Sequence, residues 1–370
     1  MDTYLLSVLV FVIATAVIIY RDRKNWEFSL VSMRRTKKFL HLLDKTAKIC
    51  PRLWNFVAYT GVVVAFYLFI SGILIFSHAF MLVIQKEIKG PTGGIVIPSP
   101  SPRFEIGYGY VLIPFWFFIF LLPLIVIPHE MLHGIIARLE RIKIKSTGII
   151  FLLFIPGGAF VEQDEKEFEN ASTLSKIKVA SAGSFANFTM FLIILVIANA
   201  LWPVLADPSA IYLLNVTKDT AAYNAGLRPG MIIRGFDSQP VKTSFSAIYM
   251  PPQKHPGENI SVETDSGTFV LTLGKHPRNE SIGYMGISYM PLYRSPLTRD
   301  IVVFLRWLLL FEYWVAMFNM LPLYPLDGGL IMKSIAQHLF RKRWKIIVNT
   351  VSIIVASLLI FIIFGPIILR

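Results

Sequence analysis

Cysteine is nearly absent from this sequence, and charged residues are scarce. Cys50 is the single cysteine among 370 residues, which excludes an internal disulfide and a cluster of thiolate metal ligands. Only 16% of the residues are charged, whereas soluble domains carry about a quarter. With 55% hydrophobic residues, the composition excludes an ordinary soluble domain and is typical of a membrane protein.

Acidic residues are also few, with 23 against 36 basic ones and a formal net charge of +13. Such a charge is compatible with nucleic-acid binding, but the basic residues cluster beside long apolar runs. Lysine and arginine next to apolar spans are typical of cytoplasmic loops. We therefore expect a lipid bilayer as a partner, and no nucleic acid.

Six apolar runs are long enough to cross a bilayer, which takes about twenty residues. They cover residues 4–20, 54–83, 110–137, 179–205, 301–321 and 346–366. Taken in turn, these spans place every basic cluster on one side, which we expect to be the cytoplasm. The sequence thus predicts a polytopic α-helical membrane protein with about six transmembrane helices.

The composition changes between the fourth and fifth spans. Short alternating runs such as 260–263 and 268–271, separated by turn residues, predict a small β-rich domain outside the cytoplasm. The expected organisation is an anchor with a basic cytoplasmic loop, a first membrane part, the β-rich domain and a second membrane part. Their residues are 1–53, 54–206, 207–291 and 292–370.

The third span contains the sequence His129-Glu130-Met131-Leu132-His133. Residues four apart lie on one face of a helix, so both imidazoles can bind one metal ion. Glu130 lies beside the first ligand and can take a proton from an activated water. Each charged residue in a bilayer costs about 2.5–3.5 kcal/mol, and the alternative, polar packing between helices, leaves that cost without an evident offset.

A catalytic zinc site needs a third protein ligand and an open position for water. The carboxylates inside later apolar segments are Glu312 and Asp327. Asp327 follows a proline-containing segment, residues 319–326, and precedes Gly328 and Gly329. Irregular backbone at membrane depth occurs where it is buried in protein or lines a wet cavity. We favour Asp327 as the ligand; Glu312 remains the rival, with a polar contact between helices as its alternative role.

The motifs HEMLHG (129–134) and NMLPLYPLDGG (319–329), in this order, resemble the two signatures of the site-2 protease family of intramembrane metalloproteases. Three other segments are similar to further elements of that family: a membrane-associated hairpin loop, a GPxxN element and an inserted PDZ domain. These segments are residues 156–162, 182–187 and 224–233. Ser184 stands where the family usually has proline. The resemblance covers about Pro123 to His338.

The resemblance implies that His129, His133 and Asp327 hold one Zn²⁺ per chain and that Glu130 is the general base. It also implies that Asn187 contacts the substrate backbone or stabilises the oxyanion, the alternative being a hydrogen bond between helices. The implied activity is hydrolysis of peptide bonds within transmembrane segments of membrane-protein substrates. A metal transporter is an alternative, but no internal repeat is seen; a pseudoprotease is disfavoured by the intact Glu130.

Overall fold

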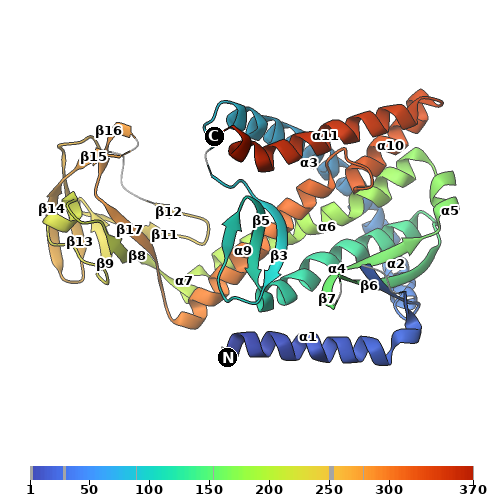
Figure 1. The fold of residues 1–370 in the computed structure, drawn as a ribbon, viewed down its shortest axis with the longest axis horizontal. Coiled ribbons are helices and arrows are strands. Elements are labelled where there is room, and N and C mark those ends of the chain that lie inside the picture. Colours follow the sequence, from blue (N-terminus) through green and yellow to red (C-terminus); the bar gives the residue numbers. More distant parts are fainter. Residues whose placement is uncertain are drawn as a thin grey trace. The chain divides into compact units, whose positions relative to one another are not determined.

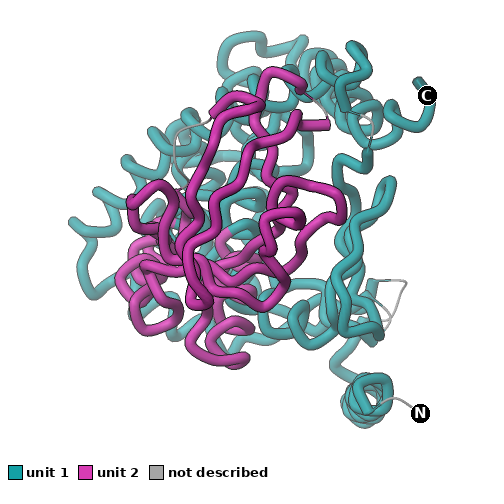
Figure 2. Tube along the Cα trace, turned by 90° about the vertical axis from the view of Figure 1, so that its left-hand side faces the viewer, with its two compact units in different colours: residues 1–191, 310–370 teal, residues 192–309 magenta. Residues whose placement is uncertain are grey.

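The computed structural model describes residues 3–27, 31–88, 90–152, 154–249, 254–277 and 279–369. The chain forms two compact units, residues 1–191 with 310–370, and residues 192–309 (Figure 2). The first unit contains both signature motifs. The second contains the predicted β-rich segment.

Among the described residues, six helices are long and apolar enough to cross a membrane, which confirms the predicted polytopic helical architecture (Figure 1). They are α1 (Thr3–Arg21), α3 (Pro51–Ile84), α4 (Phe115–Leu139), α6 (Thr173–Ala200), α9 (Pro296–Asn319) and α11 (Trp344–Ile368). Shorter helices are η1 (Arg23–Asn25), α2 (Leu40–Ile49), α5 (Glu165–Asn170), α7 (Trp202–Leu205), α8 (Ala221–Asn224) and α10 (Asp327–Phe340).

The fifth span begins at Pro296, five residues before its expected start, and the third and fourth differ from their expected bounds for physical reasons. The third begins only at Phe115, because the preceding residues form a strand that ends at Pro114. The fourth begins at Thr173 and includes two lysines that the sequence placed before it. Both lysines are buried and paired: Lys178 Nζ lies 2.9 Å from Glu140 Oε1, and Lys176 Nζ lies 3.8 Å from a Glu169 oxygen.

An antiparallel sheet lies beside the helix that carries the HExxH motif. Its order is β1-β2-β6-β7, with β1 (Trp26–Glu27), β2 (Val31–Thr36), β6 (Ile144–Leu152) and β7 (Ile155–Gln163). Leu153, which precedes the predicted hairpin loop at 156–162, lies outside the described residues. In the described part of the chain β7 is an edge strand, and it packs along α4. The basic N-terminal loop thus contributes two strands to this sheet.

The basic loop also supplies α2, which packs on α4. A β-carbon at Gly134 would lie 2.9 Å from Leu43, so the glycine permits this close contact. One buried apolar cluster joins α2, α4 and α6, and includes Leu43, Ile136 and Val179. A second joins α3, α6, α9 and α11 and includes Met317. These two clusters hold the motif helices together.

Residues before α4 form a three-stranded sheet of order β3-β5-β4. The strands are β3 (Gly94–Ser99), β4 (Glu105–Gly107) and β5 (Gly109–Pro114). The stretch is rich in proline and glycine, and such a composition does not predict strands. The parallel pairing of β3 with β5 is hard to foresee, since its pattern of alternation is short and interrupted by prolines.

The second unit is β-rich, as predicted. Its main sheet has the order β14-β13-β9-β8-β17, with β10 added to β9, around a core that includes Ile211, Leu213, Ile233 and Val262. The strands are β8 (Ala206–Val216), β9 (Ile232–Phe236), β10 (Gln239–Pro240), β13 (Asn259–Thr264), β14 (Gly267–Thr272) and β17 (Ile287–Tyr293). Two small pairs complete the unit: β11 (Lys242–Thr243) with β12 (Ile248–Tyr249), and β15 (Gly274–His276) with β16 (Asn279–Tyr284). Its assignment as a PDZ domain stays a prediction.

Candidate metal centre

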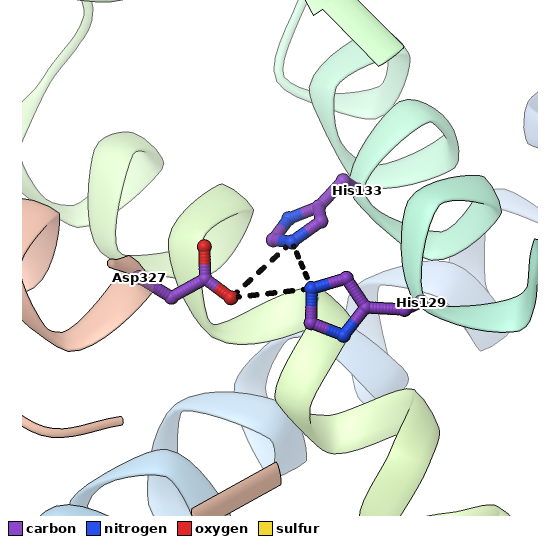
Figure 3. A group of neighbouring side chains, drawn as sticks. All are labelled: His129, His133 and Asp327. Carbon is purple, nitrogen blue, oxygen red and sulfur yellow. Dashed lines mark hydrogen bonds and ion pairs between the residues drawn. The ribbon is translucent and has the colours of Figure 1, made fainter. Parts of the chain in front are cut away.

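Side chains from two distant parts of the sequence meet at the middle of the first unit. His129 and His133 lie one turn apart on α4, and Asp327 is the first residue of α10 (Figure 3). The two Nε2 atoms are 3.2 Å apart, and Asp327 Oδ2 lies 3.5 Å from His129 Nε2 and 3.4 Å from His133 Nε2. The structure therefore brings together the three predicted metal ligands.

The spacing of these atoms fits a tetrahedral ion. Zinc binds histidine nitrogen at about 2.0–2.1 Å and carboxylate oxygen at about 2.0–2.2 Å. Two ligands of a tetrahedron with such bonds lie about 3.3–3.5 Å apart. The three observed distances, 3.2, 3.4 and 3.5 Å, are close to that edge length. The donor set, two imidazoles and a carboxylate, is one that catalytic zinc sites use.

The hydrogen-bond partners of the imidazoles direct their lone pairs at the same point. His133 Nδ1 lies 2.7 Å from the carbonyl oxygen of Val179, which can only accept, so this nitrogen carries the hydrogen. In the neutral ring Nε2 is then an acceptor. Metal-binding histidines are commonly held by such a bond from the other ring nitrogen. Two acceptor nitrogens 3.2 Å apart repel one another, and a cation between them removes that repulsion.

Asp327 is held in place by an irregular loop. A β-carbon at Gly328 would lie 2.1 Å from the carbonyl oxygen of Met320, and one at Gly329 would lie 2.5 Å from the nitrogen of Tyr324. Only glycine permits this close approach of loop and helix. The nitrogen of Tyr324 also donates to Ser352 Oγ of α11, at 3.0 Å. Asp327 Oδ2 itself is buried and has no hydrogen-bond partner among the described residues.

One face of α6 lies against both imidazoles. Val179, Gly183 and Asn187 are spaced by four residues, so they share that face. A β-carbon at Gly183 would lie 2.3 Å from His133 Nε2 and 2.4 Å from His129 Nε2. Val179 was not predicted as part of the site, and Gly183 was predicted only as a member of the segment 182–187. Their spacing from Asn187 is a signal that could have found them.

Glu130 lines the same cavity as the three ligands, a space of about 590 Å³. Its Oε2 accepts a hydrogen bond of 2.9 Å from the backbone nitrogen of Val161, on the edge strand β7. A carboxylate one residue from a metal ligand and within reach of the cavity is suited to move a proton to or from a water held there. The bond to Val161 links this carboxylate to the sheet, which the sequence did not indicate.

Polar side chains also line this cavity, among them Gln163, Glu165, Glu169 and Lys333. Lys333 Nζ lies 2.5 Å from Glu169 Oε1. Burial raises the pKa of Glu169, but the hydrogen bonds from Lys333 and Gln337 outweigh it and hold that pKa below its ordinary value. A lining of this kind gives water a path to groups that a bilayer would otherwise keep dry.

Asn187 and Glu312 lie behind His129. Both are fully buried. The amide oxygen of Asn187 is 2.5 Å from His129 Nδ1, and its amide nitrogen donates to the carbonyl oxygen of Ile125 and to Glu312 Oε2. The hydrogen bond between helices that we considered for Asn187 is therefore present. The contact of Asn187 with substrate stays a prediction. Glu312 makes a polar contact between helices, which is the alternative role considered for it.

The described residues contain six helices suited to span a membrane and a group of two histidines and an aspartate that could hold a metal ion. Together they define a polytopic membrane protein equipped to bind a metal ion. The model of Peptidase family M50 matches residues 117–363, and the chain therefore belongs to that family, the site-2 proteases. It is an integral, multi-pass membrane protein and an intramembrane metallopeptidase of the site-2 type. The chain is also 25% identical to an uncharacterized protein of Methanocaldococcus jannaschii over 346 residues, which cover 92% of this chain and 88% of the relative.

Proposed function

We propose that this chain is a zinc endopeptidase that hydrolyses peptide bonds within transmembrane segments of other membrane proteins. One Zn²⁺ per chain is held by His129, His133 and Asp327, and Glu130 is the general base. The observation that carries this proposal is the triangle of ligand atoms, with edges of 3.2, 3.4 and 3.5 Å. Glu130 lining the same cavity supports its role.

A zinc ion bound there supplies Lewis acidity, which lowers the pKa of water toward neutrality and polarises the peptide carbonyl. Glu130 accepts the proton of the attacking water and returns it to the amide nitrogen as the C–N bond breaks. The backbone nitrogen of Val161 holds Glu130 Oε2 in the cavity until that step. Lys333 and Glu169 keep the cavity polar enough to admit water.

The substrate binds as an extended strand along β7. A helix hides its carbonyls in hydrogen bonds to residues four positions away, so a transmembrane substrate must unwind before it is cut. Among the described residues no strand pairs with the edge of β7 next to Glu130, and strands add readily to such edges. Backbone groups in an antiparallel strand alternate in direction, so Ala159 and Gln163 face the same side as the nitrogen of Val161.

The substrate is apolar next to the cut. A second cavity, of about 330 Å³, is lined by Glu130 and Val161 together with residues such as Leu43, Ile149 and Phe160. Because Glu130 and Val161 also line the metal cavity, an apolar side chain beside the scissile bond can enter this second cavity. Residues of that kind dominate transmembrane segments.

The basic loops of the protein face the cytoplasm, and the β-rich segment 207–291, a PDZ-like domain, lies on the other side. This orientation is supported because the six predicted spans place four basic clusters on the same side of the membrane, and basic loops are typically cytoplasmic. The clusters are residues 21–52, 138–145, 176–178 and 341–345. The β-rich segment serves as a filter for the size or identity of the partner. Its removal should therefore change which proteins are cut rather than how they are cut.

The deciding experiment uses the purified full chain in detergent with a tagged single-span helix that contains central glycine and proline residues. We expect cleavage that a chelator stops and zinc restores. The variant Glu130→Gln should keep its zinc but lose cleavage by about 10²–10⁴-fold, the range for loss of a general base. Cleavage that survives Glu130→Gln or metal removal would contradict the mechanism, and zinc uptake into vesicles without proteolysis would favour a transporter.

A further inference from the structure

A chain of hydrogen bonds runs from His129 through two buried side chains on other helices. His129 on α4 contacts the amide oxygen of Asn187 on α6, and the amide nitrogen of Asn187 lies 2.5 Å from Glu312 Oε2 on α9. Asn187 and Glu312 have no exposed surface. Glu312 Oε1 has no hydrogen-bond partner among the described residues. The chain thus joins three membrane helices behind one metal ligand.

The direction of each hydrogen in this chain follows from one carbonyl group. The oxygen of Ile125 can only accept a hydrogen bond, and it lies 3.0 Å from the amide nitrogen of Asn187. The amide is therefore oriented with its nitrogen toward Ile125 and Glu312, and with its oxygen toward His129. That oxygen can only accept, so His129 Nδ1 carries the hydrogen and Nε2 presents its lone pair to the metal centre.

Packing alone is a poor reason for a carboxyl group at this position. Glu312 lies in an apolar helix, where a charged residue costs about 2.5–3.5 kcal/mol on insertion scales. A leucine would fill the space without that cost. What the carboxyl group adds is an acceptor for the second hydrogen of the Asn187 amide, which holds the amide in the one orientation that serves His129.

We propose that Asn187 and Glu312 are positioning residues for the metal centre: Glu312 holds the Asn187 amide, and Asn187 holds the His129 ring with its Nε2 directed at the ion. This inference rests on the metal site of the proposed function and adds to it two residues that support a ligand from behind. Outer-shell partners of this kind are worth about 10–100-fold in metal affinity.

The test measures zinc affinity of the purified full-length protein by competition with a chelator, and records the visible spectrum of the Co²⁺-loaded protein. Glu312→Leu and Asn187→Ala should each weaken zinc binding by about 10–100-fold and shift the cobalt bands, which report ligand geometry. Glu312→Gln should restore both readouts, since a glutamine side-chain oxygen accepts the same hydrogen bond. If Glu312 only filled space, Glu312→Leu and Glu312→Gln would give the same zinc affinity and the same cobalt spectrum.

A matched control is Glu140→Gln. Glu140 is a partly buried carboxylate at the C-terminal end of α4 that bonds Lys178 and Ser175 of α6, and these hydrogen bonds involve no metal ligand. We expect its zinc affinity to equal that of the unaltered chain. If Glu312→Leu does not fold, Asn187→Ala decides, because it removes the hydrogen bond to His129 directly.

The possible outcomes distinguish failure of the positioning role from failure of the proposed metal site. Unchanged zinc affinity and cobalt spectrum in Glu312→Leu or Asn187→Ala overturn the positioning role alone. A weakened affinity that Glu312→Gln does not restore also overturns the role of Glu312 as an acceptor. Zinc binding that persists in His129→Ala would instead overturn the proposed metal site itself.

Discussion

Gly183 faces both imidazoles, and a β-carbon there would lie 2.3 and 2.4 Å from their Nε2 atoms. Because real β-carbons do not approach that closely, Gly183→Ala must push α6 away from α4 or turn the rings. We predict that zinc affinity falls by at least about tenfold, the lower bound for disturbed support of a ligand. Zinc content after dialysis against a weak chelator measures this loss.

Gly158→Ala is the control, since a β-carbon at Gly158 has no atom within 4 Å. It should keep full zinc content. Equal zinc content in the two variants would mean that α6 does not limit the space around the ligands.

At the scale of single residues, the signals that predict a convergence of His129, His133 and Asp327 are local in the sequence. The spacing of His129 and His133 fixes them on one helical face, and the glycines after Asp327 mark a tight loop. The contacts of Asn187 were harder to predict from the sequence. Its partner Glu312 is 125 residues away, and nothing local in the sequence reports which helices pack side by side.

Among the elements, β7 carries the proposed substrate edge. Ala159 points its backbone nitrogen to the same side as Val161, away from β6. Ala159→Pro removes that donor while leaving the ladder to β6 its other bonds. We predict that cleavage of the single-span test helix falls by about tenfold, as expected for the loss of one hydrogen bond of about 1.5 kcal/mol, with zinc content unchanged.

The matched variant is Ala159→Gly, which keeps the backbone donor and should retain cleavage. If the proline variant cuts as fast as the unaltered chain, then the substrate does not pair with this edge and enters the cavity in another way.

Sheet β1-β2-β6-β7 also has a pH-sensitive contact. A hydrogen bond from Ser146, and then the Arg35 guanidinium, hold the pKa of Glu162 below its ordinary 4.5. A carboxyl group with a lowered pKa stabilises the fold above its ordinary pKa, and this contribution is lost as the pH falls through the lowered value. Arg35 and Glu162 are 36% and 34% exposed, so the contribution at neutral pH is about 0.5–1 kcal/mol.

Glu162→Gln should therefore speed amide hydrogen exchange in β6 and β7 by about two- to fivefold at pH 7, the factor that this free energy implies. At pH 3 the difference between variant and unaltered chain should shrink, because the carboxylate is then increasingly protonated. A difference that grows on acidification would contradict this assignment.

The elements themselves were predicted unevenly. The long apolar helices could be predicted because a run of about twenty apolar residues indicates a membrane span. The β-rich unit could be predicted because apolar and polar residues alternate along its strands. The basic residues of the N-terminal segment predict only a cytoplasmic loop, whereas the structure has two strands, β1 and β2, and the helix α2 there. β2 pairs with β6, more than a hundred residues further on, and α2 packs on α4, which begins only at Phe115. Short amphipathic elements beside a membrane carry little periodic signal.

For the whole molecule, the complete metal centre belongs to one unit, residues 1–191 with 310–370. The inserted β-rich segment begins and ends at neighbouring points, since Ala206 pairs with Tyr293. Paired residues of this kind are about 4.5–5.5 Å apart. We predict that replacing residues 207–291 by a short glycine–serine linker leaves zinc content unchanged, while thermal stability falls because Trp202 loses its hydrogen bond to Thr243.

Cleavage of the single-span test helix by this shortened chain should persist and should depend on Glu130. A shortened chain that folds but binds no zinc would show that the β-rich segment contributes to the centre.

The order of the ligands along the chain has a consequence for biosynthesis. His129 and His133 precede the β-rich segment, and Asp327 follows it. Synthesis runs from the N-terminus, so a growing chain holds two imidazoles and lacks the third ligand that a catalytic zinc site needs. If these residues form the proposed zinc site, the hydrolytic centre is assembled only after Asp327 has been synthesised, and an incomplete chain cannot cleave other nascent helices.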